Sequence, residues 1–227
     1  MCIRDSGHSV SIVDVEDRIF AHEASTPGCA VIMPVAENDF LQVCGDGTLQ
    51  LIQLDISGFE ANRVRSDVFF SVMDDAIFDR VASSGTGWFL ITHSGTIFHA
   101  STDNDEIIIE DGWNPRLEDE ENWRPGGRNE IISAHHETGL IFVAMHEGPI
   151  DTHHEPGTEI WVLDSNSKRR IGKIALDTPA NSVLVTQESN PKLLIVDSEG
   201  GSHVYDAITL SYERSIEIPG STAFEDL

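Results

Sequence analysis

Five segments of the chain follow one template, and this repeat limits the possible folds more than any other feature. Each segment starts at a Gly or Ser turn, continues as a short alternating β run that usually ends in Asp, and passes through a polar turn into another short strand. The segments begin at Gly7, Gly45, Ser94, Gly157 and Gly200. Successive copies lie about 40 to 60 residues apart, a period typical of repeat architectures. Alternation of apolar and polar residues indicates strands that are buried on one face.

Two further β-like runs precede each of the last four copies. In the final copy they are 181–187 and 192–198, and in the copy before it they are 130–136 and 140–146. Four short strands in each repeat are typical of a β-propeller. A β-sandwich is the alternative, but it does not explain the repeat. We therefore predict an all-β propeller, in which only residues 115–123 could form a turn or two of helix.

The repeat count predicts about four and a half four-stranded blades of a larger ring. The copy at Gly7 supplies only the outer half of a blade, and a propeller closes its ring to avoid long open edges. We therefore expect this chain to be the C-terminal part of a ring whose N-terminal blades are missing. Residues 1–6, which include Cys2, have no structural pattern and are interpreted as a non-native or truncated edge. Residues 7–227 are then a single partial propeller domain.

The charge of the chain excludes some classes of partner. Asp and Glu number 39 against 14 Lys and Arg, which gives a formal net charge of -25. Such a surface repels polyanions, so we expect no nucleic-acid partner. The charge fits either a salt-tolerant soluble surface or an acidic face that steers a basic partner. No apolar run approaches the roughly 18 residues that span a bilayer, so no membrane partner is expected.

Cys29 and Cys44 leave three interpretations open: a disulfide, half of a metal site, or two unrelated reduced thiols. A zinc site needs four ligands, usually closely spaced in pairs, and the nearest candidate, His22, stands alone. If 29–34 and 39–44 are neighbouring strands joined by a turn at 36–39, both cysteines reach the same edge and a disulfide is geometrically plausible. Such a bond would indicate an oxidising compartment. Two buried reduced thiols in a cytosolic protein remain the alternative.

Motifs that carry chemistry are scarce. The chain has no GxSxG elbow, no GxGxxG opening a helix and no P-loop. His146, His153 and His154, with acidic residues among them, could be taken for a metal loop, but adjacent histidines point to opposite faces of a strand. A structural or interface loop is the preferred interpretation. The four tryptophans are interpreted as core or interface aromatics, so we predict no catalytic, cofactor-binding or metal-binding residue on this chain.

A set of segments that occur in order resembles a known family. The segments are TPGCAVIMP (26–34), VCGDGTL (43–49), DDAIF (74–78), NWRPGG (122–127) and MHEGPIDTHHEPGTEIWVLD (145–164). Together they resemble the heavy subunit of the periplasmic quinoprotein amine dehydrogenases. The CGDG, DDAIF and EIWVLD segments look more like the aromatic amine branch than the methylamine branch. Members of the family form a seven-bladed propeller, and the resemblance implies the same Cys29–Cys44 pairing.

The resemblance also implies a function. In this family the heavy subunit is a scaffold for a small catalytic subunit in a heterotetramer, and the cofactor, tryptophan tryptophylquinone, is built from two tryptophans of that small subunit. The assembled enzyme oxidises a primary amine to an aldehyde and ammonia, and passes electrons to a periplasmic copper protein or cytochrome. The resemblance thus implies a periplasmic subunit of an oxidoreductase, without catalytic residues of its own. A non-catalytic periplasmic propeller that binds proteins, of the YVTN or quinoprotein-like type, is the alternative.

Overall fold

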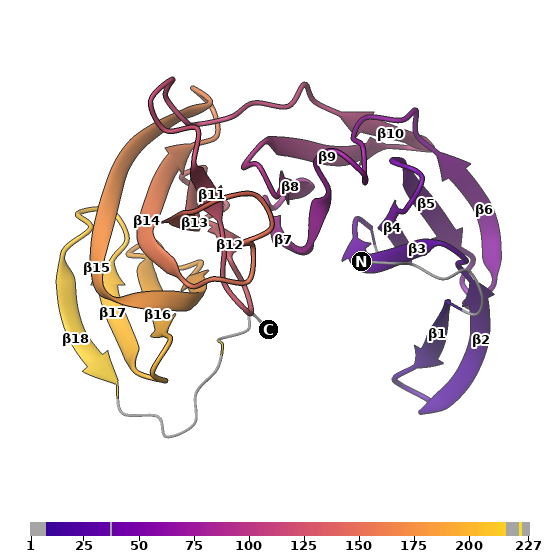
Figure 1. Ribbon diagram of the computed structural model, residues 1–227. Helices are drawn as coiled ribbons and strands as arrows, with labels where there is room; N and C mark the ends of the chain where they lie inside the picture. The colour runs from indigo at the N-terminus through magenta and orange to yellow at the C-terminus, as the bar shows by residue number, and fades with distance from the viewer. Residues whose placement is uncertain (1–7, 37, 217–222, 224–227) are drawn as a thin grey trace. The chain divides into compact units, whose positions relative to one another are not determined.

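Every regular element in the described part of the chain is a β-strand. The computed structural model describes residues 8–36, 38–216 and 223, and no helix occurs within these ranges (Figure 1). The all-β prediction is therefore confirmed. None of the described residues belongs to a helix that could cross a membrane. The proposed edge at residues 1–6, with Cys2, lies outside the described residues.

The strands are short and follow one another closely along the chain. The first ten are β1 (Ser9–Asp14), β2 (Ile19–Ser25), β3 (Cys29–Pro34), β4 (Asp39–Cys44), β5 (Leu49–Leu54), β6 (Glu60–Arg65), β7 (Ile77–Ser83), β8 (Trp88–Thr92), β9 (Ile97–Asp103) and β10 (Glu106–Ile109). The remaining strands are β11 (Trp123–Pro125), β12 (Ile132–Ala134), β13 (Leu140–Glu147), β14 (Gly157–Asp164), β15 (Arg169–Val185), β16 (Lys192–Asp197), β17 (Ser202–Asp206) and β18 (Tyr212–Ile216).

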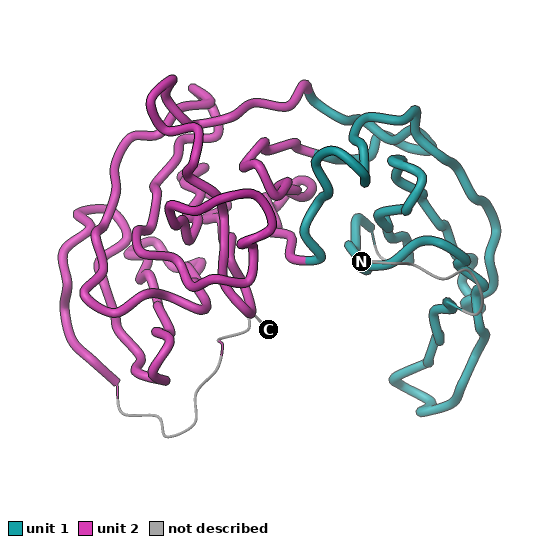
Figure 2. The backbone as a smooth tube through the Cα atoms, viewed as in Figure 1, with its two compact units in different colours: residues 1–79, 100–110 teal, residues 80–99, 111–227 magenta. Residues whose placement is uncertain are grey.

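The chain divides into two compact units (Figure 2). The first unit comprises Met1–Asp79 and Ala100–Glu110, and the second comprises Arg80–His99 and Asp111–Leu227. The expectation of a single partial propeller domain stays a prediction.

The first unit contains the β1–β2 ribbon and the antiparallel sheet β3-β4-β5-β6. In this sheet Leu41 pairs with Leu51, and both side chains are fully buried. Gln42 pairs with Gln50 on the opposite face, because successive residues of a strand alternate between faces. The sheet therefore has one apolar face and one face that carries buried polar groups.

The sheet β7–β10 has the order β10-β9-β8-β7, so consecutive strands are neighbours. Its β8 strand carries the buried side chains of Phe89, Leu90 and Ile91. Within the second unit, Ile97 of β9 also exchanges backbone hydrogen bonds with Trp113, which follows β10 in the chain.

The largest sheet belongs to the second unit and is built around the 17-residue strand β15. Residues 169–175 of β15 pair with β14, whereas residues 180–185 pair with β16. The long strand β15 is therefore part of two antiparallel meanders, β12-β13-β14-β15 and β15-β16-β17-β18. The short strands β11 and β12 both pair with β13. The strands expected at 130–136, 140–146, 181–187 and 192–198 are confirmed as β12, β13, the last part of β15, and β16. A helix at 115–123 is wrong: hydrogen-bonded turns lie there instead.

Aspartates close the turns between strands, as the repeat predicted. Asp164 accepts the backbone N–H of Asn166 at 3.0 Å. Asp206 accepts the backbone N–H groups of Thr209 at 2.7 Å and Ile208 at 3.0 Å. These bonds favour the ionised carboxylate, and with the Thr209 backbone N–H as the largest cause they lower the pKa of Asp206 to about 2. The local side-chain chemistry of Asp therefore fixes where each hairpin turns.

Candidate functional site

The predicted bond between Cys29 and Cys44 is present in the structure. The two residues are direct partners in the register of β3 and β4, with their Cα atoms 4.0 Å apart. Each cysteine is only 1% exposed. The pair is therefore a buried cross-strand link, and neither sulfur is left as a metal ligand or a free thiol.

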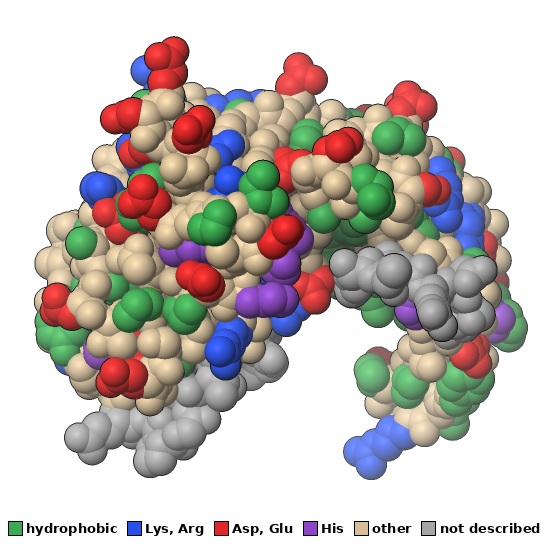
Figure 3. All heavy atoms as spheres, in the orientation of Figure 1, with side chains coloured by type: hydrophobic (Ala, Val, Ile, Leu, Met, Phe, Trp, Pro, Cys, Tyr) green, Lys and Arg blue, Asp and Glu red, His purple; other side chains and the backbone are tan. Residues whose placement is uncertain are grey.

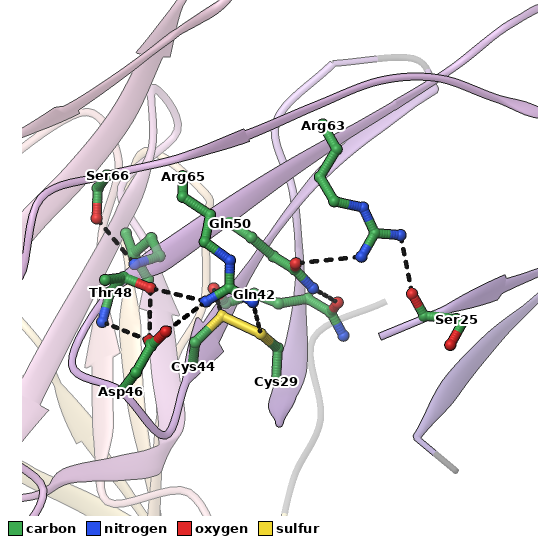
Figure 4. The surroundings of a disulfide bond; sticks show 11 residues. Ser25, Cys29, Gln42, Cys44, Asp46, Thr48, Gln50, Arg63, Arg65 and Ser66 are labelled. Atoms are coloured by element: carbon green, nitrogen blue, oxygen red, sulfur yellow. Dashed lines mark hydrogen bonds and ion pairs between the residues drawn. A yellow bond between two sulfur atoms is a disulfide. The ribbon is translucent and has the colours of Figure 1, made fainter. Parts of the chain in front are cut away.

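An arginine from β6 covers the disulfide (Figure 4). Arg65 donates through Nη2 to Cys29 Sγ at 3.4 Å and through Nη1 to Asp46 Oδ2 at 2.7 Å. The Thr48 hydroxyl donates to Asp46 at 2.7 Å, and this bond, together with Arg65, lowers the pKa of Asp46. The group holds β3, the β4–β5 turn and β6 together.

A buried amide pair continues this polar face of the sheet. Gln50 Nε2 donates to Gln42 Oε1 at 2.8 Å, and Arg63 Nη1 lies 3.5 Å from Gln50 Oε1 (Figure 4). Arg63 also donates to the backbone oxygen of Ser25 at 2.8 Å. Because buried amides cost free energy unless they are hydrogen-bonded, this network explains how the sheet tolerates two glutamines in its interior. Its role is structural.

The histidine-rich loop at 146–155 is built around a buried imidazole. His146 is 2% exposed and shares a 2.8 Å hydrogen bond through Nε2 with Thr152 Oγ1. The Thr152 hydroxyl donates its own proton to the backbone oxygen of Pro149, so Nε2 carries the hydrogen of the neutral imidazole. A Cβ atom at Gly126 would lie 2.4 Å from His146 Nδ1, and one at Gly148 would lie 3.1 Å from Cδ2. The ring is therefore enclosed by two glycines.

The other histidines of this loop stack instead of converging on one point. The His153 ring lies 4.3 Å from the His93 ring and 4.1 Å from the His154 ring, between centroids. Within residues 8–36, 38–216 and 223, no group of three or more His, Cys, Asp or Glu residues is placed to hold a metal ion. The loop is a packed structural excursion, and the expectation that the chain holds no metal stays a prediction.

We predict that His146 makes the second unit sensitive to acid. Burial lowers the pKa of His146, with further effects from Glu155, which raises it, and from Arg124 and His153, which lower it. Since the unfolded imidazole titrates near 6.5, the unfolded chain binds more protons below that pH, and stability falls as the pH drops through this range. The denaturant concentration at the midpoint of unfolding should therefore fall as the pH is lowered from 7.5 to 5.

The His146→Phe variant tests the origin of this decline. It keeps an aromatic ring between the glycines but cannot take up a proton, so its midpoint should change less with pH. His154→Gln is the matched control, because its side chain is exposed in the same loop. An unchanged pH profile in His146→Phe would show that another group is responsible.

The acidic run at 118–121 supplies one half of a partly buried ion pair. Arg170 donates two hydrogen bonds to the Glu120 carboxylate, at 2.8 and 3.0 Å. Burial alone would raise the pKa of Glu120, but the bonds from Arg170 and the backbone of Leu117 outweigh it and lower that pKa. The Arg170 guanidinium also lies 4.0 Å from the ring centroid of Trp161, whose ring is 5.6 Å from that of Trp123. Trp161 is a core aromatic and Trp123 packs beside it, partly buried, which agrees with the prediction of core or interface aromatics.

A cavity of about 310 Å³ lies in the second unit, and no sequence motif predicted it. It is lined by Val81, Ala82, Ser83, Trp88, Glu130, Ile132, Ser133, Ala134, His136, Val183, Leu184 and Gln187. These residues are contributed by β7, β8, β12 and β15 and the segments beside them. No motif spacing could have found them, because they are up to about a hundred residues apart in the chain and meet only through the sheet packing.

Comparison with known proteins agrees with the fold. The family described as methylamine dehydrogenase heavy chain (MADH) matches residues 5–223. Methylamine dehydrogenase heavy chains are 28% identical over 205 residues in Methylobacillus flagellatus and 26% identical over 214 residues in Paracoccus versutus. These alignments cover 88% and 92% of this chain, but 51% and 49% of the relatives. The chain thus spans about half the length of the curated relatives it matches.

A solved structure shows the same architecture. The β-propeller domain of Cps50 (Swd1) from Myceliophteria thermophila superposes with a TM-score of 0.61, over 93% of this chain and 66% of that chain. The sequence identity is 10%, so the likeness concerns the fold alone. It supports the predicted β-propeller, while the choice between the aromatic amine and methylamine branches stays a prediction.

Proposed function

Because the chain belongs to the methylamine dehydrogenase heavy chain family, we propose that it is part of the heavy subunit of an amine dehydrogenase. The observation that carries the proposal is the family match across residues 5–223, which includes both units. In this role the chain scaffolds a small catalytic subunit within a heterotetramer, and the complex converts primary amines to aldehydes and ammonia.

The redox chemistry in this proposal belongs to the partner. Tryptophan tryptophylquinone on the small subunit would take electrons from the amine, and a periplasmic copper protein or cytochrome would accept them. No residue of this chain is assigned to hold the quinone. Two of its four tryptophans are engaged in packing: Trp161 is fully buried beneath Arg170, and Trp123 packs beside it.

Two observations support the scaffold role and its compartment. Several carboxylates that could serve as acids or bases are engaged in turns and ion pairs, as Asp164, Asp206 and Glu120 show. The buried Cys29–Cys44 disulfide agrees with an oxidising compartment, since such bonds are rare in the cytosol. A periplasmic location is therefore part of the proposal.

The sheets also support a specific blade assignment. The β1–β2 ribbon corresponds to the outer half of one blade, and β3–β6 and β7–β10 are two complete blades. The two meanders that share β15 correspond to two more, with β18 as the outer strand of the last. This gives four and a half blades of the seven-bladed ring that the resemblance implies, with the preceding blades supplied by the other half of the heavy chain.

The proposal predicts that this chain oxidises no amine by itself. A complete heavy chain that contains residues 7–227, produced with the matching small subunit, should show a quinone absorption band and dye-linked amine oxidation. The 227-residue chain with the same small subunit should show no turnover. A small subunit in which one quinone-forming tryptophan is replaced by Phe is the control, because it should still bind the heavy chain but lack activity.

Two outcomes would contradict the proposal. Turnover by the 227-residue chain without a small subunit would overturn the scaffold role. Failure of the complete heavy chain to bind any small subunit would instead favour the non-catalytic propeller module.

A further inference from the structure

An aspartate, a histidine and a serine form one hydrogen-bonded chain at the β18 edge of the largest sheet. His203 contacts Asp197 Oδ2 through Nε2 at 2.8 Å and Ser215 Oγ through Nδ1 at 3.2 Å. The register explains the second contact, because His203 of β17 and Ser215 of β18 are direct cross-strand partners. This is the connectivity of a nucleophilic serine, a base and an orienting carboxylate, which is recognised by geometry and not by sequence spacing.

The carboxylate of Asp197 is held in place by the turn between β16 and β17. Asp197 is 6% exposed, and its Oδ1 accepts the backbone N–H groups of Gly201 at 2.8 Å and Glu199 at 2.9 Å. A Cβ atom at Gly201 would lie 2.5 Å from Asp197 Oδ2, so a side chain there would push the carboxylate away. Burial alone would raise the pKa of Asp197, but the bonds from His203 and from the turn outweigh it and lower that pKa. The carboxylate is therefore ionised at neutral pH.

The ionised carboxylate determines which imidazole nitrogen carries the hydrogen. A carboxylate only accepts, so in the neutral His203 ring Nε2 carries the hydrogen and Nδ1 keeps its lone pair. The Ser215 hydroxyl then donates to Nδ1, which is the arrangement in which a histidine takes up the proton of a serine. In the best-known sites of this kind Nδ1 faces the carboxylate and Nε2 faces the serine. The ring is reversed here, but either nitrogen can act as the base.

A tyrosine hydroxyl lies beside the serine. Tyr212 Oη is 2.9 Å from Ser215 Oγ, and it is the donor in this bond when Ser215 donates to His203. Residues three apart in a regular strand point to opposite faces, but the register shifts between Val204 and Tyr205 and brings Tyr212 to the face of Ser215. A donor this close to the serine oxygen is within reach of the oxyanion that forms when Oγ adds to a carbonyl group.

The surroundings of the serine indicate which acyl donors can react. Ser215 is exposed and Tyr212 is 55% exposed, so a small molecule reaches both from solvent. Acidic side chains are spread over the face drawn in Figure 3, in keeping with the net charge of -25. A surface of this charge repels anions, so a neutral ester is a better donor than an acyl phosphate.

We propose that Ser215 is an activated nucleophile that takes the acyl group of small, neutral, activated esters. His203 acts as the general base, Asp197 orients it, and Tyr212 donates to the oxyanion. Ser215 Oγ forms a bond to the carbonyl carbon, its proton passes to His203 Nδ1 and then to the leaving oxygen, and the bond to that oxygen breaks. Water, activated by the same base, then releases the acyl group as a carboxylic acid. This acyl transfer needs no cofactor and does not depend on the proposed amine dehydrogenase role.

Acetylation by p-nitrophenyl acetate tests the proposal on the 227-residue chain. Samples are quenched with acid at short times, before water releases the acetyl group, and the modified serines are located by peptide mass mapping. Acetylation of Ser215 should be at least about a hundredfold faster than that of Ser167, a factor that general base catalysis typically supplies. Ser167 is the internal reference, because it is also exposed and donates to Asp164 with no imidazole between them. Equal rates at the two serines would overturn the proposal.

Variants of His203 separate a base from a structural link. His203→Ala should slow acetylation of Ser215 to the rate of Ser167, and free imidazole should restore it by occupying the space left by the ring. The restored rate is taken relative to Ser167 in the same sample, since imidazole also accelerates acetylation in solution. His203→Gln is the matched control, because its amide can still donate to Asp197 but takes up no proton, so it should be as slow as His203→Ala.

The amide spectrum of each variant shows whether it is folded. A fast His203→Gln variant, or a His203→Ala variant that imidazole does not restore, would mean that the ring only links the strands and would overturn the proposal.

Asp197→Asn tests the orienting carboxylate. The new amide donates to Nε2, so Nδ1 carries the hydrogen and cannot take the serine proton, and acetylation of Ser215 should slow at least about tenfold. Asp206→Asn is the control, since Asp206 closes the next turn through Thr209 and should leave the rate unchanged. Tyr212→Phe should also slow the reaction at least about tenfold, because the oxyanion loses its donor. Parent-like rates in Asp197→Asn or in Tyr212→Phe would overturn the role given to that residue.

Discussion

Replacing both Cys29 and Cys44 by alanine is expected to lower the free energy of unfolding of the first unit by about 3 kcal/mol, because the disulfide closes a loop of about 15 residues in the unfolded chain. Both cysteines are 1% exposed and lie directly opposite each other in β3 and β4. The loss is large compared with the 5–15 kcal/mol that typically stabilises a domain. The first unit should therefore become only marginally stable, while the stability of the second unit should not change.

Amide hydrogen exchange measures this difference locally. Exchange at Leu41 and Leu51, in the sheet that holds the disulfide, should accelerate in the double variant, whereas exchange at Val162 of β14 should stay unchanged. Titration of thiols in the unfolded, unreduced parent chain should find at most Cys2. Two or three reactive thiols would show that the bond is absent in solution, and would remove the support it gives to a periplasmic location.

The strands and turns could be predicted because their causes are local. Residues 140–146 and 192–198 are short apolar runs next to turn residues, which is typical of buried strands, and β13 and β16 lie there. Asp164 and Asp206 bond to backbone groups two or three residues away, so sequence alone shows where the chain reverses. Hairpin reasoning made a Cys29–Cys44 bond geometrically plausible and the family resemblance implied it; in the structure the two residues are direct partners in β3 and β4.

The parts that could not be predicted depend on contacts between distant residues. Glu120 and Arg170 are 50 positions apart in the chain, so no local pattern predicts the ion pair between them. The cavity has the same origin, because Trp88, Glu130 and Val183 meet through three separate strands or their flanks. The expected helical turns at 115–123 failed for a related reason: Glu120 bonds to the backbone N–H of Leu117 and to Arg170, which fixes a turn there.

Trp161→Ala is expected to lower the free energy of unfolding of the second unit by about 4 kcal/mol, because it removes a fully buried aromatic side chain and leaves a cavity. The indole also carries the Arg170 guanidinium at 4.0 Å and donates through Nε1 to Glu159 Oε2 at 2.9 Å. Its loss therefore removes one hydrogen bond to Glu159 and the ring beneath Arg170, while the ion pairs Arg170–Glu120 and Lys173–Glu159 remain.

Two further variants separate these contributions. Trp161→Phe keeps an aromatic ring beneath Arg170 and should cost less than half as much as Trp161→Ala. Trp123→Ala removes the neighbouring ring, which is only partly buried, and should also cost less. Urea unfolding followed by circular dichroism measures the free energy of unfolding of each of the three variants. Hydrogen exchange at Val143 and Ile160 shows where in the second unit stability is lost. A cost below about 1 kcal/mol for Trp161→Ala would mean that this side chain is not part of the stabilising core, since surface substitutions typically cost that little.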